Sequence, residues 1–142
     1  MLLFLALATV LGSAPTASAR TAADFEGAVH TATNAVRLDH DLTKLRKKRC
    51  VDRFANRQAK KMAAADDYFH QDLEPILEKC GLSLAGENVA FGFTKAGALL
   101  KAWMDSAGHR ANILEPRYRQ LGVGARKSDE GVWYVAQVFG RR

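Results

Sequence analysis

The spacing of apolar residues predicts two long amphipathic helices in the first half of the chain. In residues 25–39 and again in residues 50–65, apolar positions recur every three or four residues, which is the period of an α-helix with one buried face. Asp24 is placed to cap the first of these helices. The second is expected to bury Val51, Phe54, Ala55, Gln58, Ala59, Met62 and Ala63.

Two shorter helices are expected further along the chain. Residues 72–79 form one candidate, and Gly81 suits the position just past its C-terminal end. A second helix should run from residue 95 to about residue 105, with Thr94 as its cap. Pro116 ends any helical turn that forms in the residues just before it.

Three segments rich in valine, glycine or aromatic residues are predicted to be strands. They are residues 88–93, 121–126 and 132–139, and the polar link 127–131 between the last two is typical of a hairpin loop. Helices come first and an antiparallel hairpin comes last, without βαβ alternation, so the pattern predicts an α+β fold. A chain of 142 residues fits one domain, here residues 20–142.

The first nineteen residues are typical of a secretory signal peptide. They contain no charged residue, they include an apolar run from Leu2 to Leu11, and they end in Ala17-Ser18-Ala19, an A-x-A cleavage site. The apolar run is shorter than the ~20 residues that span a bilayer. A basic region before the apolar run is missing, and a buried N-terminal helix is the alternative. We expect an exported protein without a membrane span in its mature part.

Export changes the interpretation of the two cysteines, Cys50 and Cys80. An even number of cysteines in an exported chain favours a disulfide, whereas two cysteines in a cytosolic protein would more often be free thiols. Neither cysteine lies in a C-x-x-C motif or beside a histidine, so the spacing gives no sign of a metal site. We therefore predict a Cys50–Cys80 disulfide.

The formal net charge of +6 comes in large part from the basic run Lys44–Arg49. Such a run can bind an anionic polymer, or it can be a solvated loop that leads into a helix. No aromatic residue is interleaved with these cations, as stacking on single-stranded nucleic acid would require. We therefore expect no nucleic-acid partner and retain an anionic polymer of the cell envelope as a possible one.

Several short motifs, in a fixed order, resemble the CAP superfamily of cysteine-rich secretory, antigen 5 and pathogenesis-related 1 proteins, in its short bacterial form. The resemblance covers residues 25–140. The motifs are Asn34-x-x-Arg37, an isolated His70, Gly86-Glu87-Asn88, Trp103-x-x-Ser106-x-Gly108-His109-Arg110-x-Asn112-Ile113-Leu114, Leu121-Gly122-Val123-Gly124 and Gln137-x-Phe139-Gly140. The resemblance implies a three-layer α-β-α sandwich with a small, mostly antiparallel sheet.

The resemblance also implies a central cavity. In the family two histidines and two glutamates line this cavity, and in several members the histidines bind a divalent metal. His70 and His109 match the two histidines and Glu87 matches one glutamate, while Ser106 stands where the second glutamate would be. We expect Trp103 to pack beneath the cavity. Asn34 and Arg37 are expected to serve the scaffold, Arg37 by pairing with a carboxylate or by capping strand carbonyls.

Loss of the second carboxylate weakens the expected metal site. Two imidazoles with at most one carboxylate or a water can hold Zn²⁺, but a tight site normally has four strong protein ligands. We therefore expect no required cofactor, and weak binding of Zn²⁺ or another divalent metal by His70 and His109. Glu87 is either a ligand and cavity acid or a scaffold group that orients a histidine or accepts backbone N–H groups.

Three functions are compatible with these residues. The first is a secreted, non-catalytic and monomeric protein that binds a lipid, a peptide or an envelope component in its cleft. The second is a weak metal-dependent hydrolase of extracellular peptides or esters, with Glu87 as the base. The third is a protein–protein interaction domain with an empty cavity. Gly-x-Ser-x-Gly and H-E-x-x-H are both missing from the sequence, which favours the first function over catalysis.

Overall fold

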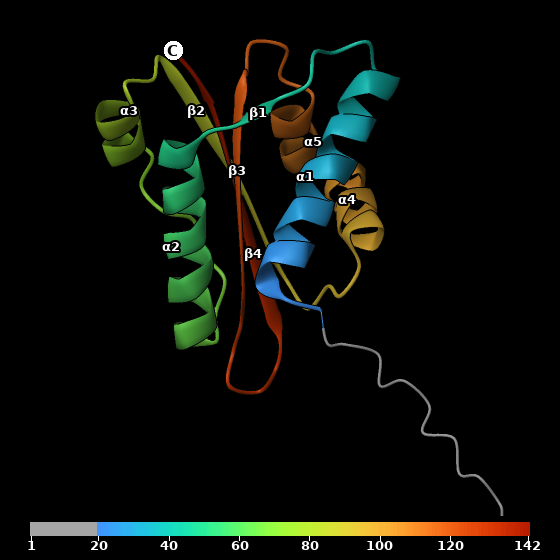
Figure 1. The fold of residues 1–142 in the computed structure, drawn as a ribbon, viewed down its shortest axis with the longest axis vertical. Helices are drawn as coiled ribbons and strands as arrows, with labels where there is room; N and C mark the ends of the chain where they lie inside the picture. The colour runs from blue at the N-terminus through green and yellow to red at the C-terminus, as the bar shows by residue number, and fades with distance from the viewer. Residues whose placement is uncertain (1–19) are drawn as a thin grey trace, which may run out of the picture.

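The computed structural model describes residues 20–142 as one sheet between two layers of helices. The sheet comprises β1 (Arg46–Lys47), β2 (Leu84–Phe91), β3 (Gln120–Lys127) and β4 (Trp133–Arg141). On one face lie α2 (Arg49–Ala65) and α3 (Glu74–Cys80), and on the other lie α1 (Ala22–Asp39), α4 (Ala96–Asp105) and α5 (Ala107–Ile113), as Figure 1 shows. This is the α-β-α sandwich that the sequence predicted.

The strands are arranged in the order β1-β3-β4-β2. Strands β3 and β4 form the expected hairpin, and β2 pairs antiparallel with the other side of β4. The two-residue β1 runs parallel to β3 and was not predicted. The mostly antiparallel character of the sheet is therefore confirmed. Central β4 is buried at every position from Trp133 to Gly140, because helices cover both of its faces.

Helix α2 covers the sheet with the face that the sequence predicted, and all seven expected side chains are buried. The close approach of α2 to β3 depends on two glycines. A Cβ atom added to Gly122 would meet the backbone of Val51 and Asp52, and one added to Gly124 would meet the backbone of Ala55. Any other residue at either position would push the helix away from the strand.

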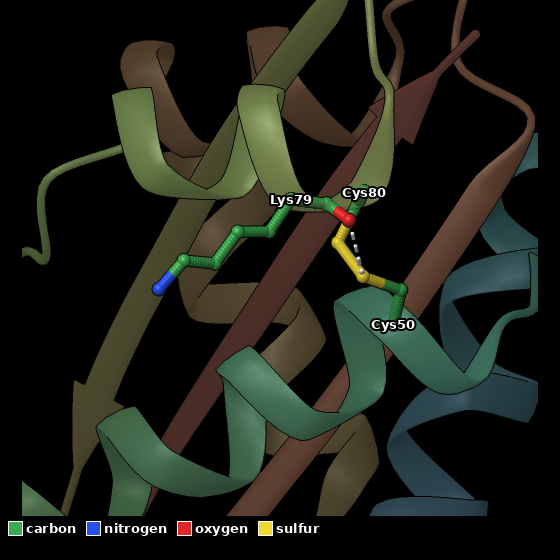
Figure 2. The surroundings of a disulfide bond; sticks show 3 residues. All are labelled: Cys50, Lys79 and Cys80. Atoms are coloured by element: carbon green, nitrogen blue, oxygen red, sulfur yellow. Dashed lines mark hydrogen bonds between the residues drawn. A yellow bond between two sulfur atoms is a disulfide. The ribbon is translucent and has the colours of Figure 1, made fainter.

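The predicted disulfide between Cys50 and Cys80 is confirmed (Figure 2). It joins the first turn of α2 to the last residue of α3, and its Cα atoms lie 5.7 Å apart, within the ordinary range. Cys50 Sγ lies 3.8 Å from the carbonyl oxygen of Lys79, which is a contact and not a hydrogen bond because a disulfide sulfur has no proton. The bridge holds α3 against the start of α2.

Several local predictions were wrong. Helix α1 begins at Ala22 after the N-cap Thr21, and Asp24 instead completes the capping box by accepting hydrogen bonds from Thr21. Lys95, not Thr94, precedes α4, and its side chain makes no capping hydrogen bond. Strand β2 spans Leu84–Phe91, four residues earlier at its start than expected.

The faces of α1 and β4 also differ from the simple periodic pattern. Asn34 and Arg37 of α1 are buried although they are polar. Trp133 and Tyr134 point to opposite faces of β4, and both are buried. Trp133 packs edge-on against Phe25 of α1, whereas Tyr134 donates a 2.7 Å hydrogen bond to Asp66, which follows α2. Both faces of the hairpin are therefore covered.

The proposed signal peptide, residues 1–19, lies outside the residues that the structure describes. Within residues 20–142, none of the helices has the length and apolar character needed to cross a membrane.

Candidate functional site

The site is built around Glu87 and Asn88, which project from β2 toward opposite faces of the sheet because side chains alternate along a strand. Glu87 points toward the segment that follows α2. Its side chain is only 2% exposed, and its Oε1 accepts hydrogen bonds from His70 Nδ1 at 2.8 Å and from the Gln71 backbone N–H at 3.1 Å. Its Oε2 accepts a hydrogen bond from Gln71 Nε2. Both carboxylate oxygens of Glu87 are thus engaged in holding the 70–71 segment.

Asn88 organises the opposite face. Its Nδ2 donates to the His109 carbonyl oxygen and to Gln137 Oε1, both at 3.2 Å. Asn112 of α5 donates in turn to Asn88 Oδ1 and to the Glu87 carbonyl oxygen, both at 2.9 Å. Gln137 of β4 completes the chain of contacts through a hydrogen bond to Thr33 of α1. These bonds join α5, β2, β4 and α1 and fix the backbone of His109.

Arg37 and Asn34 of α1 hold loops that are distant in the sequence. Arg37 is fully buried and donates hydrogen bonds to the carbonyl oxygens of Thr43, Ile113 and Glu115. Burial, reinforced by the charge of Arg119, lowers the pKa of Arg37. Asn34 exchanges two hydrogen bonds with the Leu45 backbone. The carbonyls that Arg37 caps belong to a loop and to the end of α5, not to a strand as expected.

We refer to six hydrogen-bonded side chains of this set as the polar framework. Five of them are buried, Asn34, Arg37, Glu87, Asn88 and Gln137, and the sixth, Asn112, is half-buried. All six belong to the motifs that the sequence analysis singled out.

A cleft of about 240 Å³ lies beside the framework, and we refer to it as the aromatic cleft. Ser106 and His109 supply its polar groups. Trp103 forms part of its wall, as expected, and its indole N–H donates to the Val89 carbonyl oxygen. The remaining lining residues are apolar or aromatic: Tyr68, Val89, Ala90, Phe91, Phe93 and Ala102.

Burial lowers the pKa of His109, and the charge of nearby His70 lowers it further. The lowered pKa favours the neutral imidazole, which is the form that can accept a hydrogen bond or bind a metal. His109 lies on α5, where Gly108 is an ordinary helical residue. The His109 ring centroid lies 6.3 Å from that of Trp103.

The predicted site residues thus fall into two groups. His70 and Glu87 are in direct contact, and Ser106 and His109 line the same cleft. The His70 side chain is 60% exposed, and because Glu87 accepts from its Nδ1, its Nε2 is left as the nitrogen available to a ligand. The contacts of Glu87 are those of the scaffold alternative, which orients a histidine and accepts a backbone N–H.

The donor set does not fit a tight metal site. Among residues 20–142, no group of three or more His, Cys, Asp or Glu side chains is placed to hold a metal ion. Both oxygens of Glu87 already accept hydrogen bonds, so the metal ligands that this set of residues offers are the imidazoles of His70 and His109.

Sequence reasoning missed the exposed aromatic residues that line the cleft. Tyr68 and Phe91 are 53% and 46% exposed, although large apolar side chains are usually buried. The rings of Tyr68 and Phe91 lie 5.0 Å apart, and Phe91 stacks on Tyr134 at 5.8 Å. The signal was present in the sequence, since Tyr68 and Phe69 directly precede His70 and aromatic residues close the predicted strand 88–93.

The three-layer sandwich and its polar framework define a CAP-type domain. The chain belongs to the CAP, or cysteine-rich secretory protein, family, whose model matches residues 30–139. It is 32% identical over 124 residues to the uncharacterized protein YkwD of Bacillus subtilis, covering 82% of this chain and 48% of that protein. The chain thus spans about half or less of the curated relatives that it matches.

Two solved structures illustrate the fold. One is an extracellular protein containing an SCP domain from Bacillus anthracis, with 29% identity and a TM-score of 0.73 over 85% of this chain and 41% of the other. The other is an outer surface protein from Borrelia burgdorferi, with 18% identity and a TM-score of 0.73 over 80% of this chain and 90% of the other. At that identity the second likeness concerns the fold alone.

Proposed function

We propose that this is an exported, non-catalytic CAP-domain protein that binds an amphipathic ligand, such as a lipid or an apolar peptide segment, in the aromatic cleft. The observation that carries the proposal is the composition of the cleft, in which apolar and aromatic walls surround few polar groups, those of Ser106, His109 and the Tyr68 hydroxyl among them. Binding sites for small molecules typically have this combination of apolar walls and few polar groups. The extracellular relative from Bacillus anthracis supports export.

The dimensions of the cleft favour partial enclosure of the ligand. A volume of 240 Å³ is below the ~300–1,000 Å³ of typical small-molecule sites, so part of the ligand would lie outside it. The exposed rings of Tyr68 and Phe91 offer an apolar surface for that part. His109 and Ser106 would then receive the polar end.

The contacts of Glu87 favour binding over hydrolysis. A general base must reach the proton of the attacking water. Glu87 has a 2% exposed side chain and accepts three hydrogen bonds, so it is poorly placed for that task. Among the hydrogen bonds of residues 20–142, none joins Ser106 to His109, as a serine nucleophile and its base would require.

Blocking the cleft tests the proposal. Ala102 lines the cleft and Ala98 is exposed on the same helix outside it, so A102W and A98W form a matched pair. A fluorescent fatty-acid analogue titrated into the parent should bind, A102W should weaken binding about tenfold or more, and A98W should not change it. Equal affinity of A102W and the parent would contradict the proposal.

A weak metal site is the second candidate, because Glu87 orients His70 while burial keeps His109 neutral. Zn²⁺ should bind one-to-one through the two imidazoles, with water completing the coordination. His70→Ala or His109→Ala should abolish binding, and Ser106→Glu should tighten it by adding a carboxylate. Calorimetric titration decides the matter: if both alanine variants bind Zn²⁺ as the parent does, the metal lies elsewhere.

A further inference from the structure

A second surface of the molecule is hollowed and strongly basic. Two adjoining hollows, of about 450 and 340 Å³, lie along the edge of the sheet at β1 and share Lys48 and Gln120. Lys44, Arg46 and Arg119 line the larger hollow, and Arg49 and Arg142 line the smaller one. We refer to these six cations together with Gln120 as the basic groove. It has no lining residue in common with the aromatic cleft.

The charges of the groove are not neutralised by the fold. No Asp or Glu lines either hollow, and none of the four ion pairs found in residues 20–142 involves a groove residue. Lys47, in the middle of the basic run, is different because it pairs with Asp52 at 3.5 Å on the other side of β1. Alternation along the strand thus separates Arg46 and Lys48, which face the groove, from Lys47.

Protection of the sheet edge explains only part of this pattern. Charged residues on a short edge strand prevent it from pairing with another chain, which accounts for charges on β1. It does not account for Arg119, which precedes β3, or for Arg49 and Arg142, which lie at the start of α2 and after β4. Three separate segments, residues 44–49, Arg119 and Arg142, therefore bring cations to one hollow surface.

We propose that the basic groove binds a linear polymer of phosphodiester units belonging to the cell envelope. Four of its six cations are arginines, whose planar guanidinium groups donate paired hydrogen bonds to phosphate oxygens. No aromatic side chain lines either hollow, so the groove offers nothing on which a nucleic-acid base could stack. Two adjoining hollows suit an extended ligand better than a single small anion.

The experiment uses poly(glycerol phosphate) as the probe and calorimetry or fluorescence anisotropy as the readout. Arg46, Lys48 and Arg49 make no side-chain hydrogen bond or ion pair among the interactions of residues 20–142, so R46Q/K48Q/R49Q removes three charges without removing a structural contact. R53Q/K60Q/K61Q, on the exposed side of α2, removes the same charge outside the groove. Unfolding curves establish that both variants fold.

The parent should bind the polymer with an affinity that falls steadily as salt is raised, because bound phosphates release counterions. The groove variant should lose about tenfold or more in affinity, and the control variant less than about twofold. Equal losses in the two variants would overturn the proposal, because net charge alone would then explain binding. Failure of the parent to bind would overturn it too, as would tighter binding of duplex DNA of equal charge. The A102W variant should bind the polymer normally, which separates this proposal from that for the cleft.

Discussion

The polar framework and the aromatic cleft are neighbours that draw on the same sequence motifs, but their chemistry differs. All framework side chains except the half-buried Asn112 are buried, and they are hydrogen-bonded to partners distant in the sequence, as Asn88 is to Gln137 and Arg37 is to Ile113. Ser106 and His109 face the cleft, and the ring of His70 is largely exposed. The comparison shows that a motif of polar residues can serve mainly to hold a fold and leave few groups for a ligand.

The run Trp103–Leu114 contains both kinds of residue. Asn112 belongs to the framework, through hydrogen bonds to the Glu87 carbonyl and the Asn88 side chain. Ser106 and His109 belong to the cleft, and the carbonyl of His109 accepts a hydrogen bond from Asn88. The framework therefore sets the position of α5, and α5 sets the position of the histidine.

The largest effect is expected at Arg37. Arg37→Met removes the donors to three carbonyl oxygens and should lower the free energy of unfolding by about 3–5 kcal/mol, since unsatisfied buried acceptors are costly. Urea unfolding measures the change. Arg110→Met is the control, because Arg110 donates one exposed hydrogen bond of 3.4 Å, and it should cost less than about 0.5 kcal/mol. Similar losses of stability in the two variants would show that the hydrogen bonds of Arg37 do not stabilise the framework.

A smaller effect is expected at Glu87. Glu87→Gln keeps the shape but replaces one acceptor oxygen by an amide donor that faces other donors, so stability should fall by about 1–3 kcal/mol. Glu78→Gln changes an exposed carboxylate of α3 in the same way and should leave the unfolding midpoint unchanged. If the Glu87→Gln midpoint also stays unchanged, Glu87 is solvated and serves neither fold nor site.

The smallest effect concerns the two histidines. The pKa of His109 should lie below 6.5, and His70→Gln should raise it because the charge of His70 contributes to the shift. When the pKa of a histidine is lower in the folded protein than in the unfolded chain, the unfolded chain takes up the proton first as pH falls. The free energy of unfolding is therefore highest above the unfolded-state pKa and decreases as pH falls below it. NMR titration of the ring protons measures the midpoint. A midpoint at or above 6.5 in the parent would contradict burial of His109 in the cleft.

The sequence predicted those elements whose pattern is local. Helix α2 has one apolar stripe, so its buried face was predicted correctly. Asn34 and Arg37 of α1 were predicted to serve the scaffold, but their partners were not predicted because these partners, such as Leu45 for Asn34, lie in other segments. Strand β1 was missed for a similar reason, since two residues become a strand only by pairing with Gln120 and Leu121 of β3.

The sequence predicted which residues form the candidate site, but it did not predict which of them hold the fold and which face the cleft. The motifs named His70, Glu87, Ser106 and His109, and two of the four line the cleft. The engagement of both Glu87 oxygens depends on Gln71, which no motif contained. The aromatic wall was missed because the exposure of Tyr68 and Phe91 is set by how the segment after α2 packs on β2.

Native mass spectrometry of the protein purified from its own host tests the central claim, that the aromatic cleft holds a ligand, most directly. We expect one non-covalent adduct with the mass of an amphipathic molecule, which survives chelation of metals because the apolar walls supply most of the binding. The adduct should disappear in A102W and persist in A98W. Its persistence in A102W, or its absence from the parent, would contradict the account of the cleft as a binding site.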